Sequence, residues 1–129
     1  MNQVELRTTI NALTERTITC VYRVSSTLGS GFLEKVYENA LAIELRLNGL
    51  KILQRAPIKV CYNNEPVGDF VTDLMVEDLV LVEPKATRPL DDVHSAQCLN
   101  YLKATGLNVC LLINFGKPRV EVKRIVRNY

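Results

Sequence analysis

The stretch DFVTDLMVEDLVLVEPKA, residues 69–86, decides the fold of this chain. Two runs rich in Val and Leu flank Glu77 and Asp78, a pattern typical of two buried strands joined by a short turn. Asp73, Glu83 and Lys85 interrupt these apolar runs, although charged side chains are almost never buried without partners. The stretch therefore predicts a sheet that carries a polar site in its interior.

The size and composition of the chain are those of an ordinary globular protein. Its 129 residues fit one domain, 1–129, in which 47% of residues are apolar and 23% are charged. The formal charge of +2 gives no overall electrostatic argument for nucleic-acid binding. A local excess of cations fits either a soluble edge strand or a phosphate-binding stripe; it consists of Lys117, Arg119, Lys123, Arg124 and Arg127.

The four cysteines are isolated from one another in the sequence. Cys20, Cys61, Cys98 and Cys110 form no C-x-x-C pair and no spacing typical of a zinc site or a disulfide framework, and their apolar neighbours predict buried, reduced thiols. No apolar run approaches the length of a membrane-spanning helix, and residues 1–9 lack the apolar core of a signal peptide. We therefore expect a cytoplasmic protein.

Two helices are predicted before the first strand. Apolar residues at helical spacing predict a helix over about residues 3–26, and a second helix over residues 32–48 that ends at Gly49. Glu34 lies at the edge of the apolar arc of this second helix. We expect the arc to face the core; it consists of Leu33, Val36, Tyr37, Ala40, Leu41, Ile43 and Leu47.

The rest of the chain alternates strands with one further helix. Residues 51–54, 58–62, 67–76 and 79–85 are predicted as strands, and a helix is expected from Asp91 or Asp92 to about Thr105. The apolar run LNVCLLINF, residues 107–115, predicts a strand covered on both faces, and residues 119–126 predict a last strand. This order indicates an α/β (mixed α+β) fold, with helices flanking a central mixed sheet.

The relative placement of the three charged residues depends on the turn between their strands. Glu83 and Lys85 are two residues apart, so both side chains emerge on one face of a strand. A two-residue turn would pair Asp73 with Val82 and send Glu83 to the opposite face. A three-residue connection or a bulge would pair Asp73 with Glu83, and this is the arrangement that we predict.

Two paired carboxylates in a partly dry site need a cation between them, or one of them takes a proton. Mg²⁺ suits such a site, because it binds through one or two carboxylates together with water and phosphate. Lys85 would then lie beside the metal, where an ammonium group orients water or stabilises charge on a phosphoryl group. The alternative is a buried ion pair between Lys85 and one acid. Spacing alone leaves both interpretations open.

The predicted third helix adds a polar stripe to this region. His94, Gln97 and Tyr101 lie at positions i, i+3 and i+7, within an arc that we expect to be buried. His94 alone is typical of a hydrogen-bonding residue at a helix start, and Tyr101 alone is typical of a core residue. Gln97 favours a functional site, because burying an amide without a partner costs about 1–3 kcal/mol.

Several segments resemble a known family. GFLEKVY, residues 31–37, has the spacing G-x-x-E-x-x-Y through Gly31, Glu34 and Tyr37, and resembles the signature of the GxxExxY protein family. Residues 37–50, 67–86, 94–107 and 111–118 resemble further segments of that family in order and spacing. The GxxExxY family belongs to the PD-(D/E)XK nuclease superfamily, so the resemblance implies a restriction-endonuclease-like fold.

The resemblance also implies roles for individual residues. Asp73 matches the first acidic position of the superfamily, and Glu83 with Lys85 matches its E-x-K motif. Glu34 matches the helix carboxylate of the family signature, which implies a further ligand of a metal or its water. Gln97 and Tyr101 match the Q-x-x-x-Y element of RecB-like nucleases, which helps to place the substrate or the E-x-K strand.

The function implied is hydrolysis of phosphodiester bonds with Mg²⁺, or Mn²⁺ in its place, and DNA rather than RNA is the expected partner. Pro84 departs from the aliphatic residue usual in E-x-K and is expected to break or splay the strand pairing. The break is harmless if the strands already diverge at the site; otherwise it shifts Lys85. Ser25 stands where relatives often carry His.

One alternative is a nucleic-acid-binding module without turnover. The other is a protein-interaction module that forms a homodimer through the sheet edge or the first helix.

Overall fold

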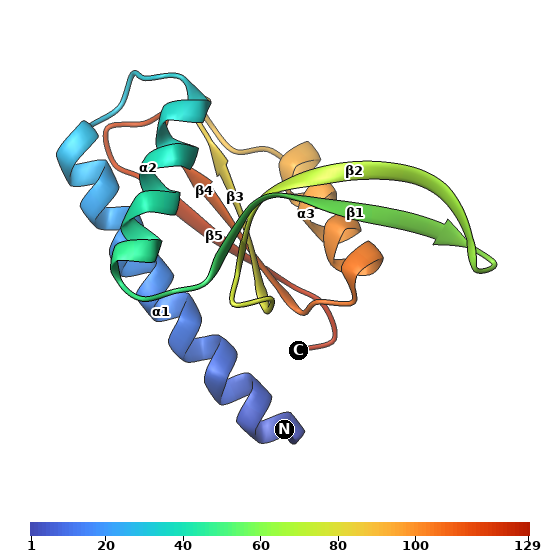
Figure 1. Cartoon of the computed structure of the whole chain (residues 1–129). Coiled ribbons are helices and arrows are strands. Elements are labelled where there is room, and N and C mark those ends of the chain that lie inside the picture. Colours follow the sequence, from blue (N-terminus) through green and yellow to red (C-terminus); the bar gives the residue numbers. More distant parts are fainter.

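The computed structural model describes all residues, 1–129. Three helices and five strands follow one another along the chain and form one layered assembly (Figure 1). In sequence order they are α1 (Gln3–Leu28), α2 (Glu34–Leu47), β1 (Ile52–Tyr62), β2 (Glu65–Val76), β3 (Val80–Lys85), α3 (Asp92–Thr105), β4 (Val109–Asn114) and β5 (Glu121–Val126).

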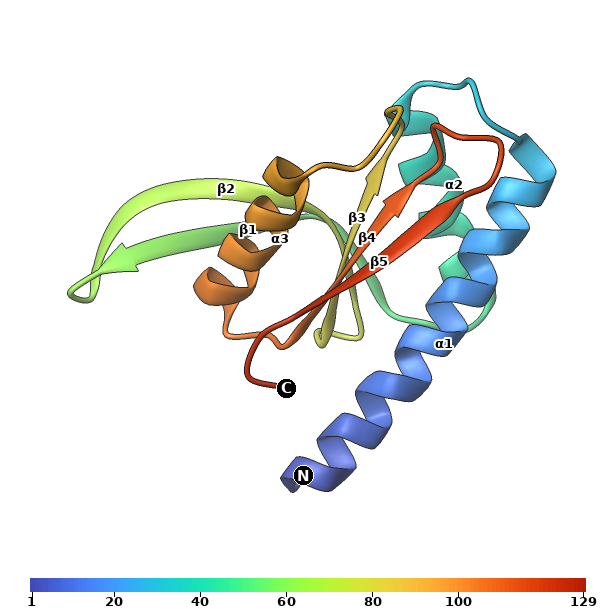
Figure 2. The same ribbon diagram turned by 180° about the vertical axis from the view of Figure 1, so that it is seen from behind.

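The five strands form a single sheet in the order β1-β2-β3-β4-β5. Only β3 and β4 are parallel, and α3 is the crossover that connects them. The other neighbouring pairs are antiparallel. Helices α1 and α2 cover one face and α3 covers the other (Figures 1 and 2). The predicted mixed sheet with flanking helices is therefore confirmed.

The alternation of side chains along β3 and β4 divides the core in two. Val80 and Val82 pack against α1 and α2, whereas Leu81 packs against Cys98 and Leu102 of α3. Every residue of β4 is buried, as the apolar run in the sequence predicted. Glu83 and Lys85 continue the alternation from Leu81, so their side chains project toward the α3 face.

The predicted strands 51–54 and 58–62 are one continuous strand, β1. Pro57 lies opposite Val71 on this edge strand, where a missing N–H is tolerated because no further strand pairs on its outer side. Residues 65–73 of β2, which precede Leu74, pair only with β1. This part of the two strands forms an arm that reaches past α3 (Figures 1 and 2). Cys61 lies on this arm and is exposed, so its predicted burial is wrong; the other three cysteines are buried.

The predicted core arc of α2 is also wrong in part. Tyr37, Leu41 and Leu45 face the core, and the ring of Tyr37 stacks on Phe115 at 4.7 Å between centroids. The apolar arc of α2 is wider than the face of the helix that packs against the sheet. Four of its members are therefore exposed to solvent: Leu33, Val36, Ile43 and Leu47.

Pro84 does not displace the strand on which it lies. The carbonyl of Lys85 accepts the N–H of Phe115 at 2.8 Å, so the backbone groups of Lys85 face β4. Because successive residues face opposite neighbours, Pro84 faces β2, and β3 pairs with β2 only as far as Val82. The missing N–H of Pro84 therefore costs no hydrogen bond in the sheet, and Lys85 keeps its register opposite Asn114.

The remaining general predictions concern the sheet edge and membrane association. β5 is an edge strand, as expected for its cation-rich sequence. None of the three helices combines the length and the apolar character needed to cross a membrane.

Candidate functional site

The turn between β2 and β3 has three residues and places the two acids side by side. Leu74 pairs with Val82 and Val76 with Val80, so residues 77–79 form the connection. One step further along this register, Asp73 lies opposite Glu83. The backbone N–H of Asp73 donates to Oε1 of Glu83 at 3.2 Å. The predicted three-residue connection is therefore confirmed.

Both carboxylates are almost removed from solvent. Asp73 is 8% exposed and Glu83 is 2% exposed. Burial, followed by the charge of Asp73, raises the pKa of Glu83 to about 9, while the charge of Lys85 acts in the opposite direction. Lys85 is half-buried on the same face of β3. The ammonium group of Lys85 thus offsets only part of the negative charge of this pair.

Glu34 reaches this region from the other layer of the fold. It is the first residue of α2 and is exposed at the surface, and the partial burial of its carboxyl group is the main reason that its pKa lies above the ordinary value. The charges of Lys85 and Asp73 also act on it, in opposite directions, so its carboxylate lies within electrostatic range of both. The pairing of β2 with β3 ends at the Leu74–Val82 pair, so the two strands separate next to Asp73 and Glu83.

The other residues of the G-x-x-E-x-x-Y pattern hold the loop that leads to Glu34. The hydroxyl of Tyr37 donates to the carbonyl of Gly29 at 2.6 Å and accepts the N–H of Phe32 at 3.2 Å. Gly31 has a φ of 116°, which favours glycine. This network fixes the start of α2 and hence the position of Glu34.

The polar stripe of α3 lies at the border of the buried surface rather than within it. Only Cys98 and Leu102 of α3 are buried, whereas Gln97 and Tyr101 are half-buried. The argument that Gln97 needs a buried partner is therefore wrong. Burial first, then the charges of Glu83 and Asp73, raises the pKa of Tyr101 to about 12. His94 caps the helix, because its Nδ1 accepts the N–H of Asp91 at 3.3 Å.

Two residues of this region were missed by the sequence analysis. Glu38 is 2% exposed, and its carboxylate accepts hydrogen bonds from Lys35 at 3.1 Å and from Gln54 at 2.6 Å. Its position four residues after Glu34 on one helix was a usable signal, because such residues share a helix face. Arg55 is the second residue, and its pairing had no signal in the sequence.

Arg55 supplies a cation at the exposed side of the acids. It lies between the Gln54–Leu74 and Ala56–Thr72 pairs, opposite Asp73 in the register of β1 and β2. Its Nη1 is 3.2 Å from Oδ1 of Asp73 and 4.0 Å from Oε1 of Glu38. Its φ of 61° is in the left-handed region, which is uncommon for a non-glycine residue within a strand.

The donor set fits a hard divalent cation. Asp73 and Glu83 supply adjacent buried carboxylates, and burial followed by the charge of Asp73 raises the pKa of Glu83 to about 9. No group of three or more His, Cys, Asp or Glu side chains has the arrangement of a metal site. The fit is therefore to Mg²⁺ bound by two carboxylates and completed by water, and Glu34 fits as a ligand of such a water better than as a direct one.

Comparison with known proteins agrees with this geometry. The family model described as "PD-(D/E)XK nuclease superfamily" matches residues 11–125. The chain belongs to the PD-(D/E)XK nuclease superfamily. Enzymes of this superfamily typically use divalent metals. The finer assignment to the GxxExxY group stays a prediction from the sequence.

A solved structure shares the fold of this PD-(D/E)XK chain. The crystal structure of SSO0001 matches with a TM-score of 0.58 and 16% sequence identity. The match covers 97% of this chain but 63% of that one, so the chain spans less than two thirds of the length of its structural neighbour. At this identity the similarity concerns the fold alone. No curated protein matches the chain in sequence.

The first prediction concerns the pH dependence of stability without metal. The pKa of Glu83 is about 9 in the folded protein against an ordinary value of 4.5, so between these values the folded protein keeps a proton that the unfolded chain releases. The free energy of unfolding should therefore fall as the pH rises from 6 to 8, by up to about 1.4 kcal/mol per pH unit. Urea unfolding in EDTA at both pH values measures this.

Glu83→Gln should flatten this pH dependence, because the amide does not titrate. Glu44→Gln is the matched control, since Glu44 pairs with Arg23 on the far side of α2 from the acids and should leave the dependence unchanged. A wild-type protein whose stability rises between pH 6 and pH 8 contradicts the proposed protonation of the acid pair.

The second prediction concerns Arg55. Arg55→Gln removes the cation that faces Asp73 and Glu38 and should lower the free energy of unfolding in EDTA by roughly 1–2 kcal/mol. Arg23→Gln is the control, because its ion pair with Glu44 has nearly the same length, 3.3 Å, and its side chain is 57% exposed against 55% for Arg55. Equal losses in the two variants would show that Arg55 does not compensate the buried acids.

Proposed function

We propose that the protein is a divalent-metal-dependent nuclease that hydrolyses phosphodiester bonds in nucleic acid, through a single domain formed by residues 1–129. The observation that carries this proposal is the pairing of two buried carboxylates, Asp73 and Glu83, where β2 and β3 separate, with Lys85 two residues after Glu83 on the same strand. Two adjacent buried carboxylates are suited to a metal and poorly suited to stabilising a core.

In this proposal Asp73 and Glu83 hold Mg²⁺, or Mn²⁺, and Glu34 binds one of its water ligands. The metal supplies a Lewis acid that lowers the pKa of bound water and neutralises phosphate charge. Lys85 lies two residues from Glu83 on the same face, where its ammonium group orients the attacking water or stabilises negative charge on the phosphoryl group. Gln97 and Tyr101 support the E-x-K strand from α3.

A module that binds nucleic acid without cleaving it is the main alternative. This alternative assumes that Pro84 displaces Lys85 from the site. The preserved register of Lys85 opposite Asn114 removes that reason and favours a working site. We propose DNA rather than RNA as the substrate, following the family resemblance. We also propose a cytoplasmic location, with which four unpaired cysteines agree.

The third prediction tests the metal site directly. Millimolar Mg²⁺ or Mn²⁺ should raise the melting temperature of the wild type by roughly 2–6 °C, as for a ligand at about ten times its dissociation constant. Asp73→Asn and Glu83→Gln should abolish both this shift and metal-dependent cleavage of DNA. Asp69→Asn, an exposed acid on the same strand, should retain both.

Glu83→Gln separates loss of function from loss of folding. Folding of the wild type at pH 8 requires Glu83 to take up a proton, whereas the neutral amide does not, so the metal-free variant should be at least as stable as the wild type at pH 8. A wild type that shows no shift with either metal, or a Glu83→Gln variant that keeps the shift, contradicts the proposed metal site.

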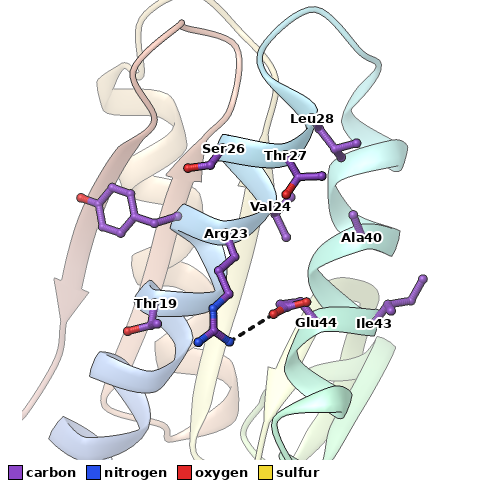
Figure 3. Close-up of a pocket in the computed structure, with 10 residues that line it drawn as sticks. Thr19, Arg23, Val24, Ser26, Thr27, Leu28, Ala40, Ile43 and Glu44 are labelled. Atoms are coloured by element: carbon purple, nitrogen blue, oxygen red, sulfur yellow. Dashed lines mark hydrogen bonds and ion pairs between the residues drawn. The ribbon is translucent and has the colours of Figure 1, made fainter.

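Self-association is a second candidate, favoured by an exposed apolar stripe on α2. The spacing of the stripe is 3-4-3-4, as on the contact face of a coiled coil. Beside it, α1 and α2 enclose a groove of about 720 Å³, which Ala40 and Ile43 line (Figure 3). We propose that the partner is a second copy with α2 antiparallel, because this packs identical stripes and opposes the helix dipoles. The stripe consists of Leu33, Val36, Ala40, Ile43 and Leu47.

The fourth prediction is therefore a homodimer formed through the α1–α2 face rather than through the sheet edge or α1 alone. Light scattering should give twice the 14.6 kDa mass of one chain. Ile43→Lys should give monomers, whereas Val67→Lys, at an equally exposed apolar position on the arm, should leave the dimer intact. A wild type that is monomeric at high micromolar concentration rejects this interface.

A further inference from the structure

A second groove lies between the arm and α3, on the face of the sheet toward which Glu83 and Lys85 project. It has a volume of about 970 Å³. One wall comes from β1 and β2 and includes Lys59, Cys61 and Phe70, and the other comes from α3. Figures 1 and 2 show that the arm runs beside α3.

The groove leads to the candidate active site. Gln97 and Tyr101 line it from α3. Phe70 lines it from β2, three residues before Asp73 on the same strand, so one end of the groove approaches the acid pair. The ring of Phe70 stacks on Tyr101, with centroids 4.5 Å apart and planes 17° apart. An aromatic pair therefore joins the two walls.

The chemistry of the lining is that of a nucleic-acid strand site. None of the lining residues is an acid. Lys59 on the arm and Lys103 on α3 place one cation on each wall, where they can meet backbone phosphates. Gln97 and Asn100 provide amide donors and acceptors for base edges, and the rest of the surface is mostly apolar. Together these features match the faces and edges of nucleobases.

We infer that this groove binds the unpaired bases of a single-stranded segment that leads to the cleaved bond. The inference rests on the proposed nuclease function and specifies its substrate. Within a duplex the base faces are covered by stacking, so an apolar wall meets them only when the strand is unpaired. The preferred substrate is therefore single-stranded DNA or a duplex with a single-stranded flap, rather than a continuous duplex.

Cys61 provides a direct test, because it lines the groove and is exposed, whereas the other three cysteines are buried. The rate of its alkylation by a maleimide, followed by mass spectrometry in EDTA, reports occupancy of the groove without cleavage. A single-stranded oligonucleotide should slow this rate by about fivefold or more relative to the same concentration of blunt duplex. Rising salt should weaken the protection.

Variants on the exposed groove rim keep the test independent of folding. Lys103→Glu reverses a charge at an exposed helix position and should reduce the protection of Cys61 by the single strand several-fold. Lys117→Glu lies outside the groove, on the loop before β5, and should leave the protection of Cys61 unchanged. Equal protection by single strand and duplex, or no protection by either, overturns the inference.

These outcomes are distinct from those of the metal experiments. Loss of the metal-induced shift in melting temperature concerns Asp73 and Glu83, whereas alkylation of Cys61 is measured without metal. A protein that binds metal but shows no strand-dependent protection retains the proposed catalysis and rejects this groove. An acidic peptide that can bind the lysines is tested in place of the oligonucleotide. If it slows the alkylation of Cys61 to the same extent, the groove is not a nucleic-acid site.

Discussion

The register between β2 and β3 is the constraint on which the rest of the site depends. Three residues in the turn put Asp73 opposite Glu83, whereas two would have sent their side chains to opposite faces. The acids are then buried beside each other, and the pKa of Glu83 rises to about 9 because neither solvent nor Lys85 balances both charges. Either a proton on Glu83 or an added divalent cation then completes the charge balance of the pair.

Two cations on different strands offset the negative charge of Asp73 and Glu83. Lys85 acts from the α3 face of the sheet, and Arg55 acts from the exposed side through a strand residue with a left-handed backbone. Glu38 binds Arg55, Gln54 and Lys35, so α2 is tied electrostatically to β1 at the point where the sheet opens. A divalent metal on Asp73 would compete with the guanidinium of Arg55 for the same carboxylate.

The sequence predicted the mixed sheet and the three helices, because strand alternation and helical spacing are local properties. The pairing of the acids was predicted from the charges in the buried stretch, since the sequence left the length of the turn open. The sequence did not predict Arg55, since its left-handed φ has no residue-type signal, or the exposed half of the α2 arc, since one apolar arc does not show how much of it the sheet covers. Gln97 was singled out on the assumption of burial, but it is only half-buried. Pro84 was expected to break or splay the strand pairing, and the pairing of β3 with β2 does end at Val82, while Lys85 keeps its register on β4.

The most direct measurement of the central claim is anomalous diffraction from crystals soaked in Mn²⁺. The account predicts one peak between the carboxylates of Asp73 and Glu83, at ligand distances of about 2.1–2.2 Å, with Arg55 turned away from Asp73. A peak elsewhere, or none at a Mn²⁺ concentration that saturates other magnesium enzymes, would show that the buried acids do not form a metal centre.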